Sequence, residues 1–312
     1  TYFGAFNTTF SPNLKTKLQF TTSSFKTIES ESFDILGEYW LYQLDNSLGS
    51  DNFGDVKYGS KQSDSLPSLA SRVKYNLGIN NSDCVCYDLI FGCPGWIEGV
   101  IQANAFIKAG IAKKCLVIGA ETLSRTFDIN DRDSMIYSDG AGATIIEKMD
   151  DNLNQGILSH KSCTFSNENT FDLFLGESFN SKNKSKDKFI KMYGHKIYEF
   201  AITKVPQALK ECLETSGKSI KDVKKIFLHQ ANEKMDDAMV DRFYKLFDLP
   251  RPEHVMPMSI KKLGNSSVAT IPTLFDLVKN NKLENHTLNK GDIVLFGSVG
   301  AGMNVNAIAY QI

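Results

Sequence analysis

Short apolar runs separated by longer amphipathic stretches recur along most of this chain. Apolar runs of strand length, bounded by polar residues or glycine, predict strands over 84–91, 114–119, 140–146, 223–228, 292–297 and 304–310. Apolar residues at helical spacing predict helices over 98–109, 196–215, 234–247 and 267–279. Strands that alternate with helices in this way indicate a layered α/β protein.

A few positions interrupt this pattern. Pro206 lies inside the helix predicted over 196–215 and should kink or split it, because proline has no backbone N–H to donate. The stretch 178–188 is poor in apolar residues and predicts a solvated loop. The first residues resemble the interior of a strand and lack the features of a signal peptide, which leaves open an earlier natural start.

Composition narrows the class of protein. With 312 residues the chain can form one large domain or two of ordinary size. Its 42% hydrophobic and 23% charged residues are typical of soluble globular proteins. A formal net charge of −1 gives no reason to expect binding to nucleic acid or to a membrane surface. No apolar stretch is long enough to span a bilayer.

Six cysteines are scattered along the sequence. Cys84 and Cys86 are separated by one residue in a strand-like run, and no second cysteine pair accompanies them, so no metal site is expected. The scatter favours reduced thiols, as in a cytoplasmic protein.

Cys93 differs from the other cysteines because it lies between a predicted strand and a predicted helix. The strand breaks at Gly92, and Pro94 suits the first position of a helix. A thiol at the start of a helix faces unpaired N–H groups and the positive end of the helix dipole, which favours the nucleophilic thiolate. The alternative is a small apolar side chain that fills a gap in the core.

Four other segments place polar residues or glycines where strands end. His229 follows an apolar strand in the run Phe-Leu-His-Gln-Ala-Asn, and Asn265 lies in Leu-Gly-Asn-Ser-Ser. The stretch 138–143 predicts a tight glycine-rich turn, and 297–302 predicts a glycine-rich loop. Each feature has a structural alternative: a buried structural histidine, ordinary turn chemistry, or close backbone packing.

Together and in this order, the features resemble the β-ketoacyl-ACP synthase III family of the thiolase superfamily, from about residue 62 to the C-terminus. Further segments carry the resemblance: Leu66-Pro67, Leu77-Gly-Ile79, Ile118-Gly-Ala-Glu-Thr122, Asp128-Ile-Asn-Asp-Arg132 and Met192-Tyr-Gly194. It implies the thiolase fold, a five-layered αβαβα arrangement of two related halves. Residues 1–155 would hold the nucleophile, and residues 156–312 the histidine and asparagine.

The resemblance also implies a chemistry. Cys93 would accept an acyl group from a thioester, and malonyl-ACP would then lose CO2 and attack the acyl-Cys93 in a decarboxylative Claisen condensation. His229 and Asn265 would stabilise the enolate as neutral hydrogen-bond donors. The backbone N–H groups of Cys93 and Gly302 would form an oxyanion hole, with Gly300 as the alternative because the glycine-rich run can be aligned two residues earlier.

Substrate contacts follow from the same comparison. Leu66 and Trp96 occupy positions that shape the acyl pocket, Arg132 flanks the adenine of coenzyme A, and Lys234 is a candidate for docking acyl carrier protein. The family's clamp is completed by an arginine and a tryptophan near the N-terminus, but the aligned stretch 24–28 lacks the arginine, and no tryptophan precedes Trp40. This loss favours a primer carried on acyl carrier protein or a coenzyme A site that is built differently. Lys234 has the alternative of a solvated surface charge.

Two carboxylates near these features are interpreted as structural. Glu98 and Glu121 stand where a general base could act, but decarboxylation needs none. No metal or dissociable redox cofactor is expected, since both substrates are carried on coenzyme A or phosphopantetheine. The expected partners are acyl carrier protein and a second copy of this chain in a homodimer.

Three functions remain open. The first is initiation of fatty-acid synthesis, and the second is a specialised ketosynthase or acyltransferase of secondary metabolism that uses acyl-ACP. The third is a non-catalytic partner subunit, which the intact Cys93, His229 and Asn265 argue against. The sequence does not give the length or branching of the primer.

Overall fold

The computed structural model describes residues 4–8, 39–44, 67–149, 155–167, 169–180, 182 and 187–312. Leu66, which the sequence suggests for the acyl pocket, lies outside the described residues.

The first large sheet has five strands in the order β1-β5-β4-β2-β3. Its strands are β1 (Gly4–Thr8), β2 (Tyr39–Leu44), β3 (Val85–Ile90), β4 (Lys114–Thr122) and β5 (Asp139–Glu147). β2 pairs in parallel with both β3 and β4, whereas β5 is antiparallel to β4 and β1. Because β2, β3 and β4 are parallel, their C-terminal ends lie at the same end of the sheet, and Cys93 follows β3 there.

The second large sheet has four strands in the order β6-β11-β10-β9. Its strands are β6 (Gly156–Thr164), β9 (Val223–Leu228), β10 (Ile293–Gly300) and β11 (Asn304–Gln311). β9 and β10 are parallel, and β11 is antiparallel to both of its neighbours. The step from β5 to β6 separates the two sheets along the chain. A division into related halves at residue 155 agrees with this step and stays a prediction.

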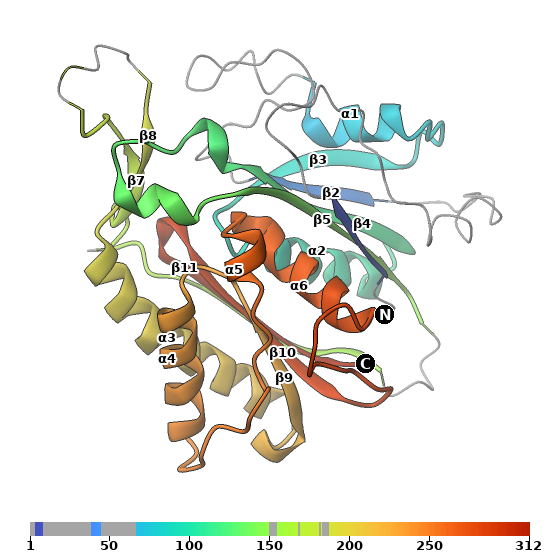
Figure 1. The fold of residues 1–312 in the computed structure, drawn as a ribbon. Coiled ribbons are helices and arrows are strands. Elements are labelled where there is room, and N and C mark those ends of the chain that lie inside the picture. Colours follow the sequence, from blue (N-terminus) through green and yellow to red (C-terminus); the bar gives the residue numbers. More distant parts are fainter. Residues whose placement is uncertain are drawn as a thin grey trace.

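Helices cover and separate the sheets in five layers (Figure 1). α2 (Gly95–Lys108) and α6 (Thr270–Lys279) lie between the two sheets. α1 (Leu69–Asn76) covers the outer face of the first sheet, and α3 (Gly194–Thr215) with α4 (Glu233–Lys245) covers the outer face of the second. The short α5 (Ile260–Leu263) precedes the loop of Asn265. This is the αβαβα arrangement that the sequence predicts.

The central layer is held by aromatic packing. Phe227 of β9 stacks on Phe296 of β10, with ring centroids 5.4 Å apart, and Phe275 of α6 meets Phe227 edge-on at 5.3 Å. All three side chains are fully buried. Burial of each such ring contributes about 2–3 kcal/mol, so α6 is fixed against the strand that leads to His229.

The structure corrects two sequence-based predictions about elements. The stretch predicted as a turn over 138–143 instead leads directly into β5, which begins at Asp139, and its glycines allow close packing of the sheet against the chain that enters α6. A Cβ on Gly142 would lie 2.6 Å from the Pro272 side chain, and one on Gly140 would lie 2.9 Å from Ser266. α3 is one helix through Pro206, which is buried, so the predicted split of this helix is wrong.

A two-stranded sheet of β7 (Leu173–Gly176) and β8 (Phe189–Met192) lies beside the large sheets. The apolar pattern alone does not reveal this pair, because each strand has only four residues. Among the described residues, none of the helices combines the length and apolar character that crossing a membrane requires.

Candidate active site

Cys93 lies in the short connection between β3 and α2. Pro94 has helical dihedral angles (φ −70°, ψ −2°) and its carbonyl accepts the first helical bond, from Glu98 N–H at 3.1 Å. The backbone around the thiol is packed tightly against the end of β10. A Cβ on Gly300 would lie 2.6 Å from Cys93 N, and one on Gly92 would lie 2.7 Å from Ala301 N. Glycine at 92 and 300 is what permits this approach.

His229 directly follows β9, and its own N–H continues the strand pairing by donating to Gly297 O at 3.0 Å. The side chain is 4% exposed, and its Nδ1 lies 2.8 Å from the hydroxyl oxygen of Thr270. Burial lowers the pKa of His229 to about 4, although a backbone hydrogen bond with Ser267 acts in the opposite direction. The imidazole is therefore neutral at physiological pH, and its Nε2 edge is the one turned away from Thr270.

Asn265 is fixed by both its backbone and its side chain. Its N–H donates to Ile136 O at 2.7 Å, and its carbonyl accepts from Ser138 N–H at 2.9 Å, so the loop is tied to the start of β5. Its Oδ1 accepts from the N–H of Ser267 at 2.9 Å. Because the amide oxygen is engaged there, the Nδ2 group is left to serve as a donor. Asn265 thus supplies the kind of group that an enolate oxygen needs.

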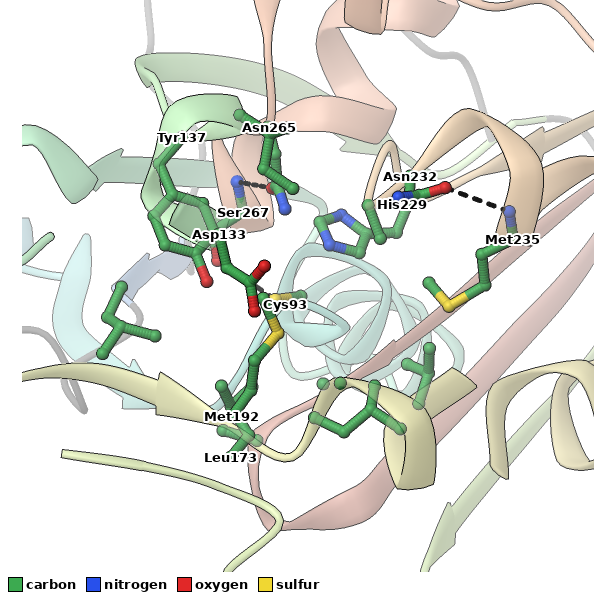
Figure 2. A pocket seen from close by; sticks show the side chains of 18 of the residues that line it. Cys93, Asp133, Tyr137, Leu173, Met192, His229, Asn232, Met235, Asn265 and Ser267 are labelled. Atoms are coloured by element: carbon green, nitrogen blue, oxygen red, sulfur yellow. Dashed lines mark hydrogen bonds between the residues drawn. The ribbon is translucent and has the colours of Figure 1, made fainter. Parts of the chain in front are cut away.

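A cavity of about 540 Å³ brings Cys93, His229 and Asn265 together on one wall. Figure 2 shows these three side chains converging from three separate segments of the chain. The other walls are mostly apolar and come from the β7–β8 pair, the segment before β5 and α3; they include Leu173, Phe174, Leu175, Ile190, Met192, Met135, Ile136, Tyr137 and Ile197. A space of this kind suits a flexible apolar chain.

Ser267 is a site residue that the sequence analysis does not identify. Its hydroxyl donates to Cys93 Sγ at 3.3 Å, and its φ of 50° places it in the left-handed region, which is uncommon for a residue with a Cβ. The only available signal is a pair of serines after Asn265, which looks like ordinary helix-capping chemistry. Tyr137 also lies near the thiol: burial raises its pKa well above the ordinary value, and a charge on Cys93 adds to the effect.

Two of the suggested substrate contacts line the cavity. Arg132 and Lys234 are both in its wall and come from different halves of the chain. Lys234 is the second residue of α4, whose N-cap Asn232 accepts from its N–H at 3.0 Å. The cavity therefore has positive groups in addition to its apolar surface.

Two suggested residues do not line this cavity, and their suggested roles stay predictions. Trp96 is 1% exposed in the central layer, where its indole N–H donates to Thr144 at 3.2 Å, and it is not in the wall of the cavity that the described residues form. It points inward because it belongs to the first turn of α2, which is buried between the sheets. Gly302 is also not part of that wall, whereas Gly300 and Ala301 are. β10 extends to Gly300 instead of ending at 297, which puts the alternative residue, Gly300, beside Cys93.

The two carboxylates interpreted as structural make hydrogen bonds to groups other than Cys93. Glu98 accepts hydrogen bonds from Ser162 at 2.8 Å and from Asn306 at 2.7 Å, and so links α2 to β6 and β11. Glu121 is buried in β4 and accepts from the N–H of Thr122 at 2.9 Å. Within the described part of the chain, no group of three or more His, Cys, Asp or Glu residues could hold a metal ion.

Two family models match the sequence. Residues 87–164 match 3-oxoacyl-[acyl-carrier-protein (ACP)] synthase III, and residues 213–312 match the C-terminal part of 3-oxoacyl-[acyl-carrier-protein (ACP)] synthase III. The two matches cover Cys93, His229 and Asn265.

Curated relatives agree with the family models. The chain is 31% identical over 274 residues to the β-ketoacyl-[acyl-carrier-protein] synthase III of Porphyra umbilicalis, covering 85% of this chain and 79% of the relative. It is 32% identical over 240 residues to the enzyme of the same name from Rickettsia bellii (strain OSU 85-389), covering 77% and 70%.

Solved structures share the fold. The synthase III from Thermus thermophilus superposes with a TM-score of 0.69 at 26% identity, over 89% of this chain and 77% of that one. A priming β-ketosynthase of the R1128 polyketide pathway also superposes with a TM-score of 0.69, at 21% identity over 89% and 75% of the two chains, and shows likeness of fold alone.

Proposed function

Because this chain belongs to the 3-oxoacyl-[acyl-carrier-protein] synthase III family, we propose that it condenses an acyl thioester with malonyl-ACP through an acyl group on Cys93. The observation that carries this proposal is the convergence of Cys93, His229 and Asn265 on one wall of an apolar cavity. These residue types supply a nucleophile and two neutral donors, which are the groups the two half-reactions require.

In the first half-reaction the sulfur of Cys93 attacks the carbonyl carbon of the primer thioester. A new C–S bond forms, the bond to the carrier's sulfur breaks, and the thiol proton leaves with the carrier thiolate. The start of α2 and the hydroxyl of Ser267 at 3.3 Å both favour negative charge on Cys93 Sγ. The backbone N–H of Cys93 and the segment of Gly300 and Ala301 packed against it are our candidates for the oxyanion hole.

In the second half-reaction malonyl-ACP replaces the first carrier. Its carboxylate leaves as CO2, and the electrons of the broken C–C bond form an enolate whose oxygen accepts from His229 and Asn265. The enolate carbon attacks the acyl carbonyl, a C–C bond forms, and Cys93 leaves as thiolate. His229 can serve as a neutral donor because burial keeps its pKa at about 4.

The substrate class follows from the walls of the cavity. The apolar lining supports an alkyl primer, while Arg132 and Lys234 offer positive charge to the phosphate of a coenzyme A or phosphopantetheine arm. Acyl carrier protein is accordingly our proposed partner. We further propose a homodimer and, because the scattered cysteines favour a reducing compartment, a cytoplasmic location.

Two measurements on the intact protein test this function. Incubation with acetyl-CoA, octanoyl-CoA or the matching acyl-ACPs should add the mass of one acyl group, and Cys93→Ala should abolish the addition. Release of labelled CO2 from malonyl-ACP should fall roughly 10²-fold in His229→Ala and in Asn265→Ala, the scale of losing one oxyanion donor, while acyl uptake persists. Acylation of Cys93→Ala would disprove the nucleophile assignment, and equal loss of both steps would disprove the division of roles.

A protein that takes up acyl groups but never releases CO2 from malonyl-ACP would point to the second candidate function, acyl transfer without condensation. The neutral donor pair is the observation that favours condensation, since transfer alone needs no enolate stabilisation.

A further inference from the structure

Thr270 is the first residue of α6. Its hydroxyl proton has two possible acceptors, His229 Nδ1 and the carbonyl oxygen of Ser267. Its hydroxyl oxygen lies 2.8 Å from His229 Nδ1 and 2.9 Å from the carbonyl oxygen of Ser267. The N–H of Gln230 also points at this oxygen, at 3.4 Å. A hydroxyl carries a single hydrogen, so it donates either to the imidazole or to the carbonyl, but not to both.

The choice determines which nitrogen of His229 carries the imidazole proton. If Thr270 donates to Ser267, then Nδ1 must carry the proton and donate to Thr270, and Nε2 is left as a bare acceptor. If Thr270 donates to Nδ1, the proton of the neutral ring is on Nε2. Only the second arrangement gives the enolate oxygen a donor from His229.

We propose that Thr270 is a positioning residue for condensation: by donating its hydroxyl proton to Nδ1, it holds neutral His229 with its proton on Nε2. This inference rests on the proposed function, because it concerns the donor that the decarboxylation step uses. Thr270 does not touch the substrate and acts only through His229. The N–H of Gln230 donates to the same hydroxyl oxygen at 3.4 Å in either arrangement, so the choice between them rests on the donor that decarboxylation needs.

The surroundings of the ring explain why the hydroxyl is needed. His229 is buried, so no solvent is at hand to accept from or donate to Nδ1. The backbone of Ser267 offers the ring a competing hydrogen bond. Without the hydroxyl, Nδ1–H would donate to the Ser267 carbonyl, which would stabilise the tautomer with a bare Nε2.

Thr270→Val tests this idea because it keeps the shape of the side chain and removes the hydroxyl. We expect the release of labelled CO2 from malonyl-ACP to fall roughly 10- to 100-fold, between the loss of one hydrogen bond and the loss of a whole oxyanion donor. Acylation of Cys93 by acetyl-CoA or octanoyl-ACP should change less than about threefold. Thr270→Ser keeps the hydroxyl and should restore most of the CO2 release.

Thr273→Val is the matched control. Thr273 is one turn further along α6 and similarly buried, but its backbone faces Gly142 of β5 rather than His229. This variant should leave both half-reactions close to the wild type. If the two valine variants lowered both steps equally, Thr270 would have only a structural role and the proposal would fail.

The tautomer can be observed directly, without any activity. In protein labelled with ¹⁵N-histidine, two-bond ¹H–¹⁵N correlations distinguish a protonated Nε2 from a protonated Nδ1, and His229→Ala identifies the signals of His229. We expect Nε2–H in the wild type and in Thr270→Ser, and Nδ1–H in Thr270→Val. A wild-type ring protonated on Nδ1 would overturn the proposal even if the valine variant did not fold.

The spectra also allow the role of Thr270 to be tested separately from the proposed function. If the wild type neither takes up acyl groups nor releases CO2, the proposed function fails. The tautomer of His229 and its response to Thr270→Val would still be decided by the spectra.

Discussion

At the scale of single residues, Ser267 links the three groups of the active site. Its N–H donates to Asn265 Oδ1, its hydroxyl donates to Cys93 Sγ, and its carbonyl oxygen lies 2.9 Å from the Thr270 hydroxyl beside His229. A φ of 50° is needed to aim these groups in their three directions. Strain of about 1–3 kcal/mol at a functional position is tolerated when surrounding contacts hold the residue in place.

The hydroxyl of Ser267 should make Cys93 more reactive. Its hydrogen bond stabilises the thiolate more than the thiol, because a charged acceptor forms the stronger bond. In Ser267→Ala we expect alkylation of Cys93 by iodoacetamide at pH 7 to slow by roughly tenfold, measured as the rate of mass increase of the intact protein.

Ser266→Ala is the appropriate control for that measurement. Ser266 is buried in the same loop, but its hydroxyl lies against Gly140 of β5 rather than against the thiol. Equal alkylation rates in the wild type and Ser267→Ala would mean that α2 alone activates Cys93.

At the scale of elements, α4 contains a buried carboxyl group whose side-chain oxygens have no hydrogen-bond partner among the described residues. This group belongs to Asp236, which is fully buried one turn after the N-cap Asn232. Burial raises the pKa of Asp236 well above its ordinary value, and the neighbouring Asp237 adds to the effect, whereas the backbone N–H of Asn232 acts weakly in the opposite direction. Such an acid makes its folding contribution as the neutral form, and that contribution is lost as pH rises through the raised pKa.

Asp236→Asn should therefore stabilise the protein at high pH. The substitution removes the ionisation without changing the size of the side chain. We expect a gain of about 1–3 kcal/mol in the free energy of unfolding at pH 8, which shrinks as the pH approaches 4. Urea unfolding followed by circular dichroism at both pH values measures it.

Asp237→Asn provides the comparison on the same helix. Asp237 is half exposed and pairs with Arg251 at 2.8 Å, so its loss should cost less than about 1 kcal/mol. If Asp236→Asn destabilised the protein at pH 8, the carboxylate would have a stabilising partner, and our account of α4 would be wrong.

The junctions between elements explain what the sequence could predict. Cys93 was recognisable because the strand, glycine and proline that position it are adjacent in the chain. The choice between Gly300 and Gly302 was not, since it depends on how far β10 extends along β11. The burial of Trp96 was not recognisable for a similar reason: only the packing of α2 between two sheets determines which side of its first turn is buried.

At the scale of the whole molecule, the site depends on contacts between distant segments. Thr270 and Ser267 look like capping residues in sequence, and their roles appear only when α6 is brought against β9. The glycines of β5 resemble a turn until Pro272 and Ser266 are packed against them. Fold class and the three principal site residues follow from ordered local patterns, whereas the residues that orient them follow from the layered packing.

The stability of the whole molecule should fall in mild acid because two histidines are buried in neutral form. Burial lowers the pKa of both His229 and His286 to about 4; for His286, Lys225 and His254 also disfavour the charged ring. In the unfolded chain a histidine side chain has a pKa of about 6.5. Between pH 6.5 and 4 the unfolded state therefore binds more protons, and the contribution of each ring to stability is lost as the pH falls.

His286 allows this effect to be measured away from the active site. In His286→Gln we expect the loss of unfolding free energy between pH 7 and pH 4.5 to be smaller than in the wild type by about 1–2 kcal/mol, because this ring is less deeply buried than that of His229 and solvent partly screens it. Urea titrations at pH 7, 5.5 and 4.5 give the slopes. Parallel slopes for the wild type and His286→Gln would show that the cluster around Lys225 does not exclude the charged imidazole.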